Sequence, residues 1–162
     1  MNSGIRLERV NAQSDFDYFA RMAFNEPVMV MNMGRVFTQE EAEGYFASML
    51  SYASDNPSSG GYKAFDVQTG AFIGMGSLWL RDDGAEIDYM VLPEYWGKGY
   101  AAAIAARLVD IARAGGVQRV TGITDPGNAA SARVLIKNGF AFDHMMHVDE
   151  DDSDAAVYVL KL

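Results

Sequence analysis

A glycine-containing turn between an apolar strand pattern and an alanine-rich helix pattern constrains this chain more than any other feature. It lies within residues 93–102, which read PEYWGKGYAA. Glycine allows positive φ and close backbone approach, so the N–H groups of such a turn can converge on an anion. The start of the following helix adds N–H groups that have no intrahelical acceptor. Taken alone, the stretch fits either a phosphate cradle or an ordinary strand-to-helix turn in which glycine serves only the geometry.

Hydrophobic periodicity and turn residues divide the rest of the chain into short strands and helices. Ser14-Asp15 offers an N-cap, and the segment from Thr38 to Glu41 matches a capping box. Residues 28–34, apolar and rich in methionine, predict a loop that either floors a substrate pocket or fills the core. The predicted strands are 5–10, 62–67, 71–80, 85–92, 117–124, 140–148 and 155–162, and the predicted helices are 15–24, one beginning at Thr38, 99–114 and 128–138.

The predicted strand at 85–92 leads directly into the glycine turn. Strand pleating puts Glu86 and Asp88 on one face and Ile87 and Tyr89 on the other. Two carboxylates on a face that lines a pocket would be chemically significant, whereas on an exposed face they would be ordinary. The three strand patterns before the turn are joined by short links, which predicts successive antiparallel hairpins.

Length and charge restrict the organisation and the partners of the chain. At 162 residues it is expected to form one domain, residues 1–162. The net charge of −9 disfavours nucleic acid and favours cationic small molecules or basic peptides. Much of the acidic excess lies in residues 149–154, which predict a solvated loop. No apolar run reaches membrane-spanning length and the first residues lack the apolar core of a secretory signal, so we expect a cytoplasmic protein with no membrane partner.

Cysteine and histidine usage limits the chemistry. The sequence contains no cysteine, which excludes disulfides, thiolate catalysis and zinc–sulfur sites. His144 and His147 are three residues apart in a predicted strand and would point to opposite faces, so they do not form a metal-binding pair. We therefore expect no bound metal.

Three segments of the sequence belong together: Trp96-Gly97-Lys98-Gly99-Tyr100-Ala101, Asn128-Ala129-Ala130-Ser131 and Lys137-Asn138-Gly139-Phe140. In combination they resemble the GNAT family of acetyl-CoA-dependent N-acetyltransferases, and the resemblance spans residues 5–162. It is nearest to the branch that includes ribosomal-protein N-terminal acetyltransferases of the RimJ/RimL type. The resemblance implies an α/β (α+β) GNAT fold. This fold has a mixed, mostly antiparallel sheet of six to seven strands, flanked by about four helices and splayed at the acetyl-CoA site.

The resemblance also implies acetyl-CoA as the cosubstrate. Backbone N–H groups of residues 97–102 would hold the CoA pyrophosphate, although Trp96 stands where the family usually has Gln or Arg. Backbone groups of residues 90–92 would bind the pantetheine in a gap beside the strand that starts near Val117. Asn128 would face the same arm of the cofactor, and its alternative is a role as a helix N-cap only. The predicted cofactor-binding residues are Met90, Val91, Leu92, Trp96, Gly97, Lys98, Gly99, Tyr100, Ala101, Ala102, Asn128 and Ser131.

The implied reaction needs a base for the amine and a proton donor for the departing thiolate. Glu86 is the predicted catalytic base, directly or through water, with Asp88 in reserve; the alternative is that Glu86 is only a surface carboxylate. Many family members carry a tyrosine seven residues after the asparagine, but that position is Leu135 here. Ser131 is therefore the predicted catalytic donor, as the RimL-type branch implies, and Tyr89 is a second option.

The expected activity is direct transfer of an acetyl group to a primary amine. A protein or peptide N-terminus is the first choice of acceptor, and a small amine such as a polyamine, an amino acid or an antibiotic is the alternative. Acceptor-binding residues are expected from residues 28–35, the first two helices and the closing strands. A non-catalytic CoA-binding sensor is a further hypothesis, and both a monomer and a homodimer remain open.

Overall fold

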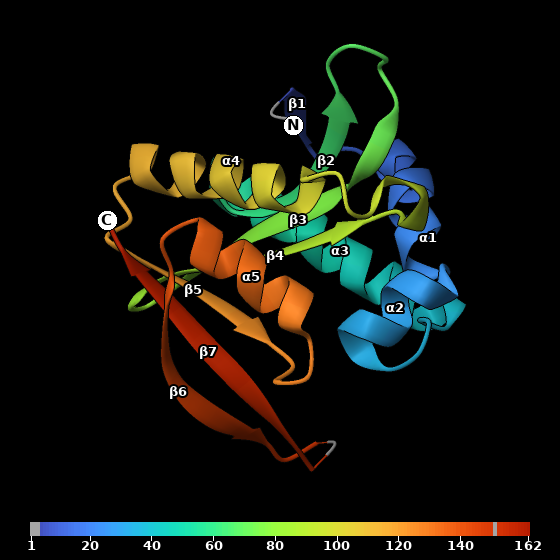
Figure 1. Ribbon diagram of the computed structural model, residues 1–162. Helices are drawn as coiled ribbons and strands as arrows, with labels where there is room; N and C mark the ends of the chain where they lie inside the picture. Colours follow the sequence, from blue (N-terminus) through green and yellow to red (C-terminus); the bar gives the residue numbers. More distant parts are fainter. Residues whose placement is uncertain (1–3, 151) are drawn as a thin grey trace.

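The sheet of the computed structural model, which describes residues 4–150 and 152–162, has the strand order β1-β2-β3-β4-β5-β7-β6. All neighbouring strands pair antiparallel except β4 and β5, which are parallel. The prediction of a mixed, mostly antiparallel α/β fold is confirmed, with seven strands in the described part of the chain (Figure 1). The strands are β1 (Ile5–Arg9), β2 (Gly60–Asp66), β3 (Phe72–Arg81), β4 (Gly84–Val91), β5 (Arg119–Thr124), β6 (Ala141–Val148) and β7 (Ser153–Lys161).

Helices cover both faces of the sheet and bury two separate hydrophobic clusters. Ile104 and Leu108 of α4 are fully buried against one face, where α5 also packs. Phe19 of α1 and Phe46 of α3 are buried in the second cluster, on the opposite face. The helices of residues 4–150 and 152–162 are α1 (Phe16–Ala23), α2 (Glu26–Met33), α3 (Gln39–Asp55), α4 (Tyr100–Ala114) and α5 (Ala129–Lys137), with short 3-10 turns at Gln13–Asp15 and Pro93–Tyr95. None of these described helices is long and apolar enough to cross a membrane.

The predicted loop at residues 28–34 is wrong, because this segment forms most of α2. Asn25 caps the helix by accepting a hydrogen bond from the Val28 N–H at 3.2 Å, and Pro27 occupies the first turn. Gly34 ends the helix at φ +85°. An almost continuous apolar run hides the helical period, and Pro27 is as compatible with the start of a helix as with the end of the previous one.

Two predicted helix caps have different outcomes. The capping box is confirmed: Thr38 Oγ1 accepts from the Glu41 N–H at 3.2 Å, and Glu41 Oε1 accepts from the Thr38 N–H at 2.9 Å. Asp15, in contrast, makes no side-chain cap on α1. Its buried carboxylate pairs with Lys63 Nζ at 2.7 Å. The side chain of Asp15 therefore forms a buried ion pair, whereas the sequence pattern predicts that it caps a helix.

The parallel pairing of β4 and β5 is short, and this creates the gap that positions the site. Their register runs only from Ala85 with Val120 to Ile87 with Gly122. Beyond Ile87 the two strands diverge, so the last residues of β4 face an opening. The strands are splayed at this position, as the resemblance to the GNAT family implies.

Candidate active site

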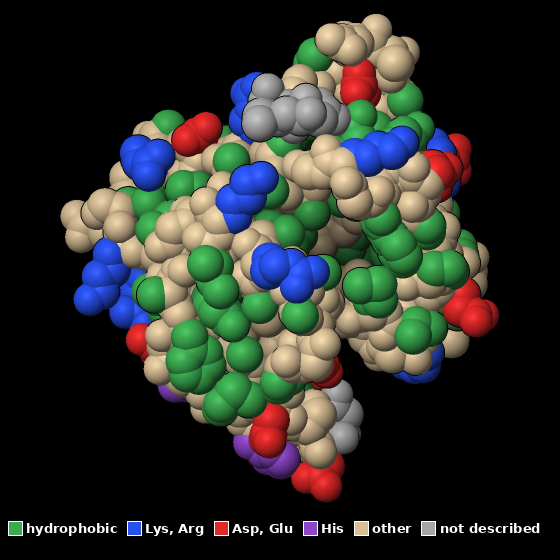
Figure 2. All heavy atoms as spheres, in the orientation of Figure 1, with side chains coloured by type: hydrophobic (Ala, Val, Ile, Leu, Met, Phe, Trp, Pro, Cys, Tyr) green, Lys and Arg blue, Asp and Glu red, His purple; other side chains and the backbone are tan. Residues whose placement is uncertain are grey.

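Two cavities meet at the end of β4. The glycine-turn cavity, of about 540 Å³, lies beneath the turn between β4 and α4. The Asp88 cavity, of about 640 Å³, lies among α2, the ends of β4 and β5, α5 and the β6–β7 hairpin. Figure 2 shows a hollow between the α4–α5 side and the α2 side of the molecule, with Lys and Arg side chains near its edge. The residues that line both cavities are Met31, Asn32, Tyr89, Asn128 and Ser131.

The glycine turn has the backbone conformation of an anion cradle. Gly97 has φ +75° and Gly99 has φ +84°, and a Cβ at either position would meet no atom within 4 Å. Glycine is therefore needed here for its left-handed backbone and not for space. Ala103 is the first residue of the helix whose N–H donates back to Gly99 O, at 3.1 Å. The N–H groups of the first helical turn, such as those of Ala101 and Ala102, consequently have no acceptor within the helix.

Cationic side chains complement this turn. Arg133 and Lys137 of α5 line the glycine-turn cavity opposite the start of α4. Backbone N–H groups, a helix N-terminus and two cations therefore surround one concave surface. This set of groups fits the pyrophosphate of a nucleotide-type cofactor.

The last residues of β4 present a free strand edge to the same cavity. Leu92 N–H donates to Ile73 O of β3 at 2.9 Å. In an antiparallel pair, successive residues of a strand bond alternately to the partner strand and to the other side, so the N–H and C=O of Val91 point away from β3. Trp96 Nε1 donates to Val91 O at 2.7 Å, which confirms that direction. The Val91 N–H thus faces the glycine-turn cavity, where it can pair with an extended amide-containing chain.

Ten of the twelve predicted cofactor-binding residues line the glycine-turn cavity. Leu92 and Lys98 do not. Leu92 is buried in the core, and the Lys98 ammonium lies 5.9 Å from the centroid of the Tyr95 ring. Tyr100 lines the cavity, but its hydroxyl points elsewhere and donates to Asp66 Oδ2 at 2.6 Å.

The Asp88 cavity contains one of the two candidate bases. Asp88 lines it, whereas Glu86 lines neither cavity and lies 3.6 Å from Arg81 Nη2. Burial raises the pKa of Asp88 to about 6, although hydrogen bonds from Trp79 and Ser77 act in the opposite direction. The neighbouring charge of Glu86 also raises this pKa. Asp88 is therefore ionised at neutral pH and can still take up a proton close to that range.

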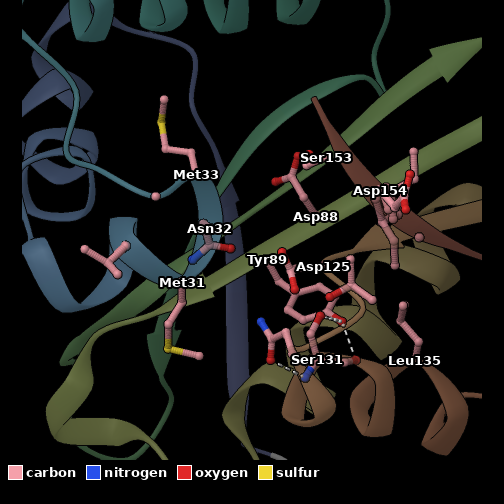
Figure 3. Close-up of a pocket in the computed structure, with 18 of the residues that line it drawn as sticks. Met31, Asn32, Met33, Asp88, Tyr89, Asp125, Ser131, Leu135, Ser153 and Asp154 are labelled. Atoms are coloured by element: carbon pink, nitrogen blue, oxygen red, sulfur yellow. Dashed lines mark hydrogen bonds between the residues drawn. The ribbon is translucent and has the colours of Figure 1, made fainter. Parts of the chain in front are cut away.

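Tyr89, Ser131 and Asn128 form the junction between the cavities. Tyr89 Oη lies 3.1 Å from Ser131 O and 3.2 Å from Ser131 Oγ (Figure 3). Burial raises the pKa of Tyr89, so its phenol stays protonated at neutral pH. Asn128 Oδ1 accepts from the Ser131 N–H at 3.0 Å, which makes Asn128 the N-cap of α5 as well as a lining residue. Leu135, at the position of the usual family tyrosine, is buried.

The sequence analysis expected acceptor-binding residues within 28–35, but it missed that this segment is helical and that it also lines the glycine-turn cavity. Met31 and Asn32 line both of them from this helix, and Met33 reaches the Asp88 cavity (Figure 3). The Asn25-Glu26-Pro27 cap and Gly34 carry the signal that could have identified the helix.

The β6–β7 hairpin brings acidic residues to the Asp88 cavity. Glu150 and Asp154 line it and are exposed. Residues 149–150 form a turn, which fits the predicted solvated loop at 149–154, but β7 already begins at Ser153, and residue 151 lies outside the described residues. Asp125 also lines this cavity. Among the described residues that line it, the one cation is Arg35, whose guanidinium nitrogens lie 2.7 and 2.8 Å from the carboxylate oxygens of Glu41. The cavity therefore has an acidic surface that suits a cationic ligand.

Comparison with known proteins agrees with this geometry. The sequence model of the family described as Acetyltransferase (GNAT) domain matches residues 5–141. The Bacillus subtilis (strain 168) protein named Uncharacterized N-acetyltransferase YoaA is 35% identical over 69 residues, which are 42% of this chain and 39% of that relative. The chain thus matches well under half the length of this curated relative.

Solved structures share the whole fold at low sequence identity. Spermidine N-acetyltransferase from Vibrio cholerae, in complex with CoA and spermine, superposes with a TM-score of 0.81 at 17% identity, covering 99% of this chain and 96% of that one. Ribosomal-protein-S5-alanine acetyltransferase from Vibrio fischeri gives a TM-score of 0.78 at 17% identity, covering 98% and 93%. These similarities show the fold alone. Because the family match spans most of the sequence, from residue 5 to residue 141, the chain belongs to the GNAT acetyltransferase family.

Proposed function

We propose that this protein is an N-acetyltransferase that transfers the acetyl group of acetyl-CoA directly to a primary amine. One observation carries the proposal: the glycine turn lines one cavity, Asp88 lines the other, and the two cavities share Tyr89 and Ser131 among their lining residues. A cofactor phosphate at the turn would leave its reactive end near the junction. An amine in the Asp88 cavity would then approach from the other side.

The chain offers a distinct set of groups for each part of acetyl-CoA, which supplies the thioester. Backbone N–H groups around Gly97, Gly99 and Ala101 would hold the pyrophosphate, with Arg133 and Lys137 adding positive charge. The exposed backbone edge at Val91 would pair with the pantetheine amides. Holding the two reactants in one gap would supply a large part of the rate enhancement.

Asp88 is the base that this geometry supports best. An alkylammonium must lose a proton before its nitrogen attacks the thioester carbonyl, and a carboxylate with a pKa of about 6 at the cavity wall is suited to accept it. Glu86, the first choice from the sequence, stands two residues back along the same strand face and beside Arg81. As the C–N bond forms and the C–S bond breaks, the Ser131 hydroxyl would give its proton to the departing thiolate. In the same step it would take up the second proton that the attacking nitrogen loses, so that the hydroxyl is restored. Tyr89 Oη would in turn hydrogen-bond to Ser131.

The acceptor that we favour is a protein or peptide N-terminus, by similarity to the RimJ/RimL-type branch. A small polyamine is the second candidate, and the acidic side chains of Asp125, Glu150 and Asp154 in the Asp88 cavity favour it specifically. A free amino acid fits less well because its carboxylate would be repelled by the same groups.

The test is thiol release from acetyl-CoA in the presence of a panel of peptides and small amines, with acetylated products identified by mass spectrometry. Asp88→Asn should abolish turnover while CoA binding is kept, and Glu86→Gln should keep most of the activity. The opposite result would return the base to Glu86. If CoA binds but no amine in the panel is acetylated, the non-catalytic sensor replaces the enzyme.

A further inference from the structure

The indole of Trp79 contacts Asp88 from the neighbouring strand. Trp79 Nε1 donates to Asp88 Oδ2 at 3.1 Å, between β3 and β4. Trp79 is 7% exposed, so the indole N–H is largely removed from water. The two residues are not directly paired in the register, because Trp79 pairs with Glu86 and Asp88 pairs with Ser77. The contact is therefore diagonal across the strands, on the face that carries Glu86 and Asp88.

Two tyrosines of α3 fix the position of the indole ring. The ring of Tyr52 meets it edge-on with centroids 4.9 Å apart, and the ring of Tyr45 does so at 6.2 Å. Tyr45 is itself stacked on Phe19 at 5.6 Å and 4°. The indole is thus held between the sheet and α3, and its N–H has little freedom to turn away from Asp88.

We propose that Trp79 is a positioning residue for catalysis: its indole N–H holds the Asp88 carboxylate toward the acceptor and stabilises the ionised form that takes the proton. The inference rests on the proposed function, in which Asp88 is the base. Trp79 lines neither of the two cavities, so it acts through Asp88 and not on the substrate.

Other charged and titratable groups surround Asp88 and stay unchanged when Trp79 is replaced. Glu86 raises the pKa of Asp88 and Arg81 lowers it, and the hydroxyl of Ser77 adds a second hydrogen bond that lowers it. The phenol of Tyr45 faces the same carboxylate from α3, and the charge of Asp88 helps to raise the pKa of this tyrosine. The charged residues that line the rest of the cavity are Arg35, Asp125, Glu150 and Asp154.

The pH–rate profile gives the first test. Trp79→Phe keeps an aromatic ring in the core but removes the donor, so the acidic limb of the profile should move to higher pH. In addition, kcat should fall while the KM for acetyl-CoA stays near the wild-type value. Tyr52→Leu is the matched control, because it removes a ring that packs on Trp79 and keeps the indole N–H. This control should leave the acidic limb in place.

Indole NMR gives a second test that needs neither turnover nor a folded Trp79 variant. The chain has two tryptophans, so the indole region contains two N–H signals, and Trp96→Phe identifies the signal of Trp79. In the wild-type protein the Trp79 signal should shift with pH as Asp88 titrates. In Asp88→Asn that titration should be lost.

The outcomes separate this inference from the proposed function. A Trp79 signal that does not titrate, or an acidic limb that stays in place in a folded Trp79→Phe protein, overturns the positioning role even if Asp88 is the base. If the signal titrates but Asp88→Asn retains wild-type kcat, the hydrogen bond stands and the catalytic role of Asp88 falls, together with the positioning role.

Discussion

Replacing Asp88 by asparagine should make the protein more stable at neutral pH relative to the wild type, even as it removes activity. The pKa of Asp88 is raised from 3.8 to about 6, chiefly by burial, so the fold disfavours the ionised form. Because the pKa of Asp88 is higher in the folded protein than in the unfolded chain, the protonated carboxyl favours folding. This contribution is fully present below pH 3.8 and is lost as the pH rises through about 6. At about 1.4 kcal/mol for each pH unit, the full effect is about 3 kcal/mol. About 1.4 kcal/mol of it falls between roughly pH 5 and pH 8.

Urea unfolding of both proteins at several pH values measures this difference. The quantity to follow is the free energy of unfolding of Asp88→Asn minus that of the wild type. The amide also has effects on stability that do not depend on pH, and these cancel when the difference is compared between pH values. It should grow by about 1.4 kcal/mol from roughly pH 5 to pH 8. Asp82→Asn, in the exposed β3–β4 turn, controls for the loss of one negative charge. A difference that stays flat over this range would refute the assignment of Asp88 as a destabilised, proton-accepting carboxylate.

Three further changes test the remaining parts of the site. Gly99→Ala and Gly70→Ala should each lower the free energy of unfolding by about 1 kcal/mol, because both glycines have positive φ and open surroundings. Only Gly99→Ala should weaken CoA binding, by about tenfold or more when the affinity is measured by calorimetry. Ser131→Ala should lower kcat by on the order of 10² in steady-state assays with little change in CoA affinity, and unchanged kcat would exclude Ser131 as the proton donor. Gly122→Ala should destabilise by about 1–3 kcal/mol in urea unfolding, since its new methyl would lie 2.5 Å from Leu135 Cδ2, and wild-type stability would contradict this close packing.

Local patterns in the sequence were sufficient for most of the fold. Alternating and helical periods predict all seven described strands and four of the five described helices, and the capping box at Thr38 predicts the start of α3. The sequence analysis does not predict helix α2, because its apolar residues form a run with no clear helical period. The local signal for this helix lies in its caps at Asn25 and Gly34.

The glycine turn is the part of the site that the sequence determined by itself. Positive φ at Gly97 and Gly99 is a local requirement, and an apolar strand followed by a helix fixes where their N–H groups point. The same local logic makes Asn128 the N-cap of α5. Neither feature needs a contact between distant parts of the chain.

Only the tertiary structure decided which of the two carboxylates, Glu86 or Asp88, lines a cavity. Glu86 and Asp88 share one face of β4, and strand pleating cannot distinguish them because both point the same way. The choice follows from where β4 and β5 separate, just after Ile87, which leaves Glu86 beside Arg81 and opens a cavity at Asp88. That separation, the indole of Trp79 behind Asp88 and the acidic hairpin beside it all depend on pairing and packing between distant segments, which no local pattern in the sequence encodes.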